Sequence, residues 1–155
     1  MVNQAIDLLA LKQDDTVLDL FCGIGNFTLP MATLSRHVTG VEGGTEMVSR
    51  ANDNAAHNDI TNVEFHAANL MAPPASAAWL NKLYNKILLD PPRAGAQEII
   101  PFLAKMDAEK IVYVSCNPAT LARDAGLLVH QLGYKLTQAG IMNMFPHTSH
   151  IEAMA

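Results

Sequence analysis

The sequence predicts an α/β fold in which a mostly parallel sheet is flanked by helices. Short apolar segments alternate with segments whose apolar residues recur at helical spacing, which is typical of parallel strands joined by right-handed crossovers. Residues 17–29 show this most clearly, because an apolar run passes through a turn containing Gly23 and Gly25 into a helical pattern. An acid, Glu42, closes the next apolar run. The chain of 155 residues is long enough for one domain with a sizeable core.

The first half of the chain predicts two crossover units. We expect Asn3 to cap a first helix with one apolar face, because asparagine is a favoured cap residue. The elements expected next are a strand over 17–20, a helix over 26–34, a strand over 36–41, a helix from Thr45 to about Asn58, and a strand over 63–66.

The second half continues the alternation. A proline-containing loop or short irregular helix over 71–78 leads to a strand over 86–89. Pro101 should break or kink a helix expected over 96–106. A strand over 110–114 is followed by a helix that Asn117 caps and Gly133 ends. The last two strands are expected over 134–141 and 150–154, joined by residues 143–149.

Composition narrows the classes of protein. Only 16% of residues are charged and the formal net charge is −5, so the chain has no overall basic footprint for nucleic acid. The two cysteines do not suggest a disulfide framework or a zinc site, which favours a reducing, cytoplasmic setting. No apolar run is long enough to cross a bilayer, and no obligatory protein partner is evident.

The first crossover unit predicts a crevice for a nucleoside-containing cofactor. Glycines allow the backbone to approach a ligand, and Glu42, nineteen residues after Gly23, is placed to hydrogen-bond a ribose diol. A dinucleotide fingerprint would need a third glycine where this chain has Thr28. Asp19 and Phe21 suit S-adenosylmethionine better than NAD, so the pattern favours a methyltransferase while other Rossmann-like enzymes stay open.

Cys116 is the candidate nucleophile. It follows a strand and directly precedes a helix, where backbone N–H groups and the helix dipole favour a thiolate. The alternative is a small core residue, which is the commoner state of a free cysteine. Cys22, in the glycine turn, is interpreted as such a core residue.

Two carboxylates are further candidates. Asp90 ends a strand before Pro91 and Pro92, whose rigid backbone leaves carbonyl groups free to contact a base or nucleoside, although a simple turn is equally consistent. Glu152 lies among apolar neighbours, where a carboxylate is costly unless it is paired or used, and it could serve as a base. A metal site formed by His147, His150 and Glu152 is disfavoured, because no fourth ligand is evident.

Five motifs follow one another along the chain: DLFCGIGNF, GVEG, LLDPPRAG, VYVSCNPATLARD and MFPHTSHIE. In this order they resemble the RNA uracil-5-methyltransferase family, whose members use S-adenosylmethionine, and the resemblance covers essentially the whole chain. The segments GIGNFTLP and SCNPATLARD resemble one type of 23S ribosomal RNA enzyme in this family more than the transfer-RNA enzyme or the second ribosomal one. The resemblance implies a Rossmann-like class I methyltransferase fold, with a seven-stranded sheet whose last strand is antiparallel.

The resemblance also implies roles for individual residues. Cys116 would add to uracil C6 and Glu152 would remove the C5 proton, with no metal ion. The residues that would line the cofactor site are Phe21, Asn26, Glu42, Asn69 and Asp90.

The resemblance also implies a longer protein, with an N-terminal OB-like TRAM domain, a central domain and a four-cysteine iron–sulfur cluster. Two cysteines cannot supply that cluster, so residues 1–155 are expected to be the catalytic domain alone, with RNA binding impaired. The rival interpretations are an amino-group or cytosine-5 methyltransferase, and an inactive domain that only binds S-adenosylmethionine.

Overall fold

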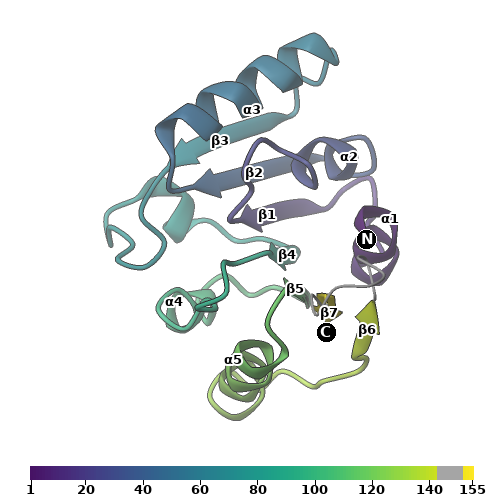
Figure 1. Ribbon diagram of the computed structural model, residues 1–155. Helices are drawn as coiled ribbons and strands as arrows, with labels where there is room; N and C mark the ends of the chain where they lie inside the picture. The colour runs from purple at the N-terminus through teal and green to yellow at the C-terminus, as the bar shows by residue number, and fades with distance from the viewer. Residues whose placement is uncertain (143–151) are drawn as a thin grey trace, which may run out of the picture.

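The structure is a computed structural model that describes residues 1–142 and 152–155. The described residues form a seven-stranded sheet with strand order β3-β2-β1-β4-β5-β7-β6 (Figure 1). The strands are β1 (Thr16–Leu20), β2 (His37–Glu42), β3 (Val63–Ala67), β4 (Lys86–Leu89), β5 (Lys110–Ser115), β6 (Gly140–Met142) and β7 (Glu152–Met154). Strands β1 to β5 pair in parallel, whereas β7 is antiparallel to both β5 and β6, which confirms the predicted sheet.

Helices cover both faces of the sheet. They are α1 (Val2–Leu9), α2 (Thr28–Ala32), α3 (Thr45–His57), the 3-10 helix η1 (Ala78–Asn81), α4 (Ile100–Leu103) and α5 (Pro118–His130). Because strand side chains alternate between faces, Leu18 and Leu20 pack in one core cluster with residues of η1, α4 and α5, whereas Val17 packs in a second cluster with residues of α1 and α2. No helix among the described residues is both long and apolar enough to span a membrane.

Two helix starts differ from the prediction. Helix α1 begins at Val2, so Asn3 lies inside the first turn and caps nothing. Helix α2 begins at Thr28 rather than at residue 26, because the positive φ of Gly25 prolongs the preceding turn.

The helix expected over 96–106 is only the single turn α4. Pro101 lies in its first turn, where a backbone N–H has no partner inside the helix in any case, so the proline begins this helix instead of breaking a longer one. The preceding residues form turns, in which the Ile99 N–H donates to the Ala96 carbonyl at 3.1 Å.

The strand expected over 134–141 is wrong for its first part, since only Gly140–Met142 pairs with β7. Tyr134 is held against other elements, because its N–H donates to the Leu128 carbonyl (3.1 Å) and its hydroxyl donates to the Ala108 carbonyl (2.9 Å). The predicted connection over 143–149 and the start of the last strand at His150 lie outside the described residues.

Candidate active site

The turn after β1 has an unusual backbone that brings it against the end of β2. Phe21, Gly23 and Gly25 have φ values of 65°, 56° and 91°. The N–H groups of Phe21 and Cys22 both donate to the carbonyl of Val41, at 2.9 and 3.1 Å. A bulky residue at positive φ is strained, and such strain is typical of functional sites. Phe21 is therefore fixed at the carboxyl edge of the sheet, as predicted for a crevice residue.

Glu42 ties the end of β2 to this turn. One carboxylate oxygen accepts from the Gly23 N–H at 3.0 Å, and the other accepts from the N–H groups of Gly43 (2.7 Å) and Gly44 (3.2 Å). A carboxylate has about four lone-pair positions, so acceptor capacity is left for a ribose hydroxyl. The acid predicted from its spacing thus also shapes the glycine turn.

Asp19 is a fully buried carboxylate at this edge. Thr28 donates to its Oδ2 at 2.5 Å, while its Oδ1 has no hydrogen-bond partner among the described residues. Burial raises the pKa of Asp19 from 3.8 to about 7; the Thr28 hydrogen bond opposes this rise, and the carboxylates of Asp90 and Glu42 add to it. An unpartnered buried oxygen beside a glycine turn fits a polar cofactor group.

The raised pKa of Asp19 predicts a pH-dependent stability. Between its unfolded value near 3.8 and its folded value near 7, the folded state binds more protons, so the free energy of unfolding falls as pH rises. Asp19→Asn removes this titration, and the stability of the variant relative to wild type should increase by about 3 kcal/mol from pH 5 to pH 8. Urea unfolding at both pH values measures the difference. A difference that stays constant with pH would contradict the raised pKa.

The pairing of β5 with β7 ends next to Cys116 and Glu152. Antiparallel pairing joins Ser115 to Ala153; Cys116 directly follows Ser115, and Glu152 directly precedes Ala153. Both residues therefore lie at the carboxyl end of β5. The Cys116 side chain is partly exposed, and the hydrogen bond from the Asn117 N–H to Ser115 Oγ (3.0 Å) spans it.

Asp90 belongs to the same edge. It follows β4, and its N–H donates to the Leu20 carbonyl at 3.2 Å. Burial raises the pKa of Asp90 to about 6, and the nearby charge of Glu152 adds to the rise. Asp90, Cys116 and Glu152, from three neighbouring strands, therefore converge at the carboxyl edge of β4 and β5.

Two predicted cofactor residues, Asn26 and Asn69, make no hydrogen bond to the other candidate site residues among the described residues. Both residues are exposed. Asn26 lines a cleft between α2 and α3, and the Asn69 side chain accepts from the N–H of Met71 at 3.0 Å. Their roles stay predictions.

The metal alternative gains no support from the described residues, in which no group of three or more histidine, cysteine or acidic side chains could hold an ion. His147 and His150 lie outside the described residues.

Sequence reasoning missed two charged pairs, each with one buried member. Lys86 is buried and its Nζ lies 2.8 Å from the exposed Glu109, and the exposed Arg123 pairs with Asp124, which is fully buried. A signal existed for Asp124, because it lies three residues after Leu121 and four before Leu128, on the apolar stripe of α5.

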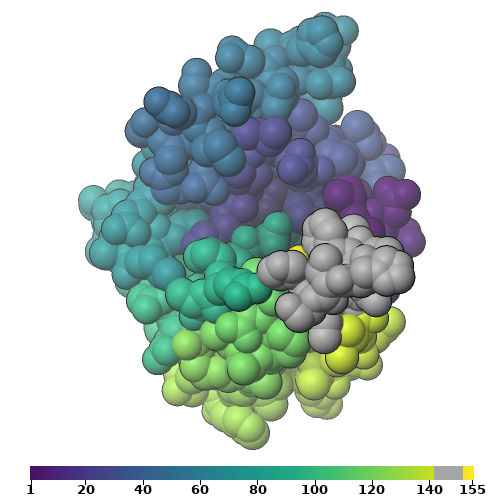
Figure 2. Space-filling view, in the orientation of Figure 1, coloured from purple at the N-terminus to yellow at the C-terminus, as the bar shows by residue number. Residues whose placement is uncertain are grey.

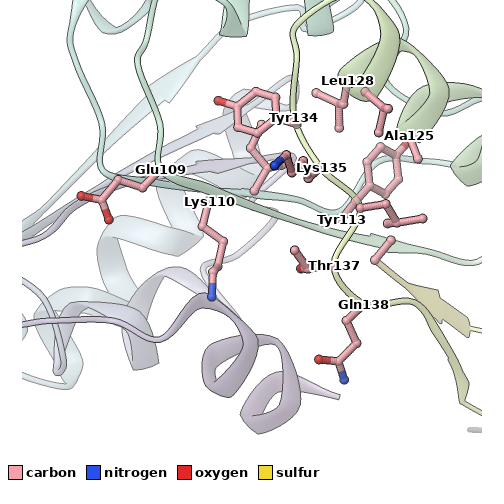
Figure 3. Close-up of a pocket in the computed structure, with 13 residues that line it drawn as sticks. Glu109, Lys110, Tyr113, Ala125, Leu128, Tyr134, Lys135, Thr137 and Gln138 are labelled. Atoms are coloured by element: carbon pink, nitrogen blue, oxygen red, sulfur yellow. The ribbon is translucent and has the colours of Figure 1, made fainter.

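A cavity of about 220 Å³ lies away from these residues, beside the first half of β5. Figure 3 shows Lys110 and Tyr113 of β5, Leu128 of α5 and Gln138 around it. It is at the opposite end of β5 from Cys116, so it is separate from the candidate active site.

Comparison with known sequences finds one matching family model and several similar proteins. A family model described as tRNA (Uracil-5-)-methyltransferase matches residues 1–154. The 23S rRNA (uracil(1939)-C(5))-methyltransferase RlmD of Methylococcus capsulatus is 56% identical over 155 residues, and that of Hahella chejuensis is 57% identical over 160 residues. Each match covers 100% of this chain and 35% of the relative, so the chain spans about a third of the relatives' length.

Solved structures share the fold. The tRNA (uracil-54, C5)-methyltransferase of Pyrococcus abyssi, in complex with S-adenosyl-L-homocysteine, matches with a TM-score of 0.80 and 29% identity over 98% of this chain and 36% of that chain. A SAM-dependent methyltransferase from Aquifex aeolicus matches with a TM-score of 0.71 and 14% identity, over 99% of this chain and 86% of that one. At that identity the second likeness concerns the fold alone.

Proposed function

Because the chain belongs to the tRNA (Uracil-5-)-methyltransferase family, we propose that it performs methyl transfer to C5 of a uridine in RNA. The class I methyltransferase fold predicted from the sequence is confirmed by its likeness to solved methyltransferases. The relatives are named for 23S ribosomal RNA, which is the proposed substrate. Residues 1–155 are proposed as the catalytic domain, and the rest of the relatives' length as the source of most RNA contacts.

S-adenosylmethionine is the proposed cofactor, and it supplies an electrophilic methyl group. Phe21 and Glu42 are proposed to hold its nucleoside, with Asn26, Asn69 and Asp90 as further contacts. The orphaned Oδ1 of Asp19 and the strained turn at Phe21 support a polar ligand at this edge. Glu42 already fixes the turn, so the acceptor positions it has left are preorganised for a ribose.

Cys116 and Glu152 are proposed to divide the chemistry between them. The Cys116 thiolate forms a bond to uracil C6, and the electron pair displaced to C5 makes that carbon nucleophilic enough to take the methyl group. Glu152 then removes the C5 proton, the C5–C6 double bond re-forms, and Cys116 leaves as a thiolate. These steps need one nucleophile and one base on the same side of the sheet edge.

The observation that carries this proposal is the register of β5 and β7, in which the pair Ser115 and Ala153 has Cys116 next to it on one chain segment and Glu152 next to it on the other. An amino-group methyltransferase would need the Asp90-Pro91-Pro92 segment but neither a thiolate nor a partner base. The three groups at this edge therefore favour methylation at a pyrimidine C5 over methylation of an amino group, and the names of the relatives favour uracil over cytosine.

The proposal is tested by mass spectrometry with 5-fluorouridine-substituted fragments of 23S ribosomal RNA and S-adenosylmethionine. Fluorine at C5 cannot be removed as a proton, so the covalent protein–RNA complex should accumulate and carry the transferred methyl group. Digestion should place the RNA on the peptide that contains Cys116. Bound S-adenosylmethionine without any adduct, at RNA concentrations that saturate binding, would contradict the uracil reaction.

A further inference from the structure

The segment that follows Asp90 is held by side chains of α5. The Asn117 Nδ2 donates to the Arg93 carbonyl (3.1 Å), and the Arg123 Nη2 donates to the Ala94 carbonyl (2.9 Å). The N–H of Ala96 donates to Asp124 Oδ2 at 2.7 Å. Three backbone groups within four residues are thus fixed by one helix, and Figures 1 and 2 show the segment after β4 lying against α5.

Asp124 is the centre of this arrangement. It is 0% exposed, and its Oδ2 accepts from the Tyr113 hydroxyl at 2.5 Å as well as from Ala96. Its Oδ1 accepts from Arg123 Nε at 2.8 Å, with Nη2 at 2.7 Å. A buried carboxylate is tolerated only when it is paired and hydrogen-bonded, and here four donor groups meet that condition.

Gly95 shows how closely the segment fits against α5. Its φ is +86°, and a Cβ atom at this position would lie 2.5 Å from Asp124 Oδ2 and would also overlap Arg123 Nη2. Only glycine therefore allows the backbone to approach the Arg123–Asp124 pair this closely.

The contacts of Asn117, Arg123 and Asp124 with residues 93–96 form a clamp. This clamp connects Asp90 with Cys116, the two sides of the candidate active site. Helix α5 starts immediately after Cys116, with Asn117 as its cap through a hydrogen bond from the Ala119 N–H (3.1 Å). The same helix holds the segment that begins at Asp90. We propose, on the basis of the function proposed above, that Arg123 and Asp124 are positioning residues that set the distance between Asp90 and Cys116.

The positioning role differs measurably from a role in stability alone. Asp90 is only one of the five proposed cofactor contacts, and a displaced Asp90 segment would leave the glycine turn and Glu42 intact, so the Kd for S-adenosylmethionine should rise no more than threefold. Methyl transfer should fall instead, because a misplacement of about 1 Å costs about a hundredfold in rate. The informative quantities are therefore the single-turnover rate of methyl transfer to 23S ribosomal RNA fragments and the Kd for S-adenosylmethionine, both measured well below the melting temperature.

The experiment compares wild type with Asp124→Asn, Gly95→Ala and Gly126→Ala. Asparagine keeps the shape of the side chain but cannot accept from every donor, and alanine at 95 displaces the clamp without removing a donor. Both variants should lose about a hundredfold in rate with a Kd within threefold of wild type. Gly126→Ala is the matched control and should keep the wild-type rate, since Gly126 lies on α5 and, apart from its chain neighbours and the backbone of its own helix, no heavy atom of the described residues lies within 4 Å of the added Cβ.

Arg123→Ala keeps the proposal testable if Asp124→Asn does not fold. The Arg123 side chain is 41% exposed, and its loss removes the hydrogen bond to the Ala94 carbonyl and the contacts to Asp124 Oδ1. It should lower the rate about tenfold or more at unchanged Kd. Folded variants with lower melting temperatures and wild-type rates would overturn the positioning role while leaving the uracil reaction intact. Absence of methyl transfer in wild type itself, at RNA concentrations that saturate binding, would instead contradict the function on which this inference rests.

Discussion

Cys116→Ala is expected to abolish both the covalent RNA adduct and methyl transfer. Without the thiolate, uracil C5 has no electron pair available for attack, so the rate should fall by about 10⁴-fold or more, as when other enzymes lose a nucleophile. Because Cys116 is partly exposed at the end of β5, its loss should leave the melting temperature and S-adenosylmethionine binding close to wild type. Mass spectrometry of the adduct and transfer of a labelled methyl group measure the two activities.

Cys22→Ala is the matched control for the loss of a thiol. Cys22 is buried in the glycine turn, and burial, together with Asp19 and Glu42, raises the pKa of its thiol, so it is held as an uncharged core group. This variant should still form the adduct, although it is expected to be less stable by about 1 kcal/mol because a cavity remains. An adduct that survives in Cys116→Ala and disappears in Cys22→Ala would reverse the two assignments.

Glu152→Gln is expected to trap the reaction after methyl transfer. The base is needed only to remove the C5 proton, so addition of Cys116 and transfer of the methyl group should proceed while release of the product slows by about 10²- to 10⁴-fold. Ordinary uridine-containing RNA should then give a methylated adduct without any fluorine substitution.

The control for this variant is Glu98→Gln, which removes one exposed carboxylate away from the strand ends and should turn over normally. Free 5-methyluridine product at the wild-type rate from Glu152→Gln would show that another group is the base. Loss of adduct formation in Glu152→Gln would instead indicate that Glu152 is needed at or before the addition step.

Much of the fold could be predicted because its signals are local. The apolar run of β1, the glycines that follow it and the acid that ends β2 each depend on residues close together in sequence. Parallel crossovers then fix which strand ends share an edge, so Asp90 and Cys116 could be assigned to one edge without coordinates.

Local signals failed where two conformations suit the same residues. Pro101 is compatible with breaking a helix or beginning one, and the choice depended on how the preceding turn packs. Residues 134–139 have a strand-like composition. Tyr134 nevertheless donates hydrogen bonds to the carbonyls of Leu128 and Ala108, so most of this segment does not pair with a neighbouring strand.

The sequence by itself determined the strand and helix order, the glycine turn, and the positions of Asp90 and Cys116 at strand ends, because hydrophobic periodicity and backbone preferences act over short distances. Only the tertiary structure decided that the start of β7, at Glu152, lies at the carboxyl end of β5, since that depends on the antiparallel register between strands far apart in the chain. It also decided that Asp124 is buried and clamps the Asp90 segment. Charged residues usually favour solvent, and only the donors that packing gathers around Asp124 make its burial stable.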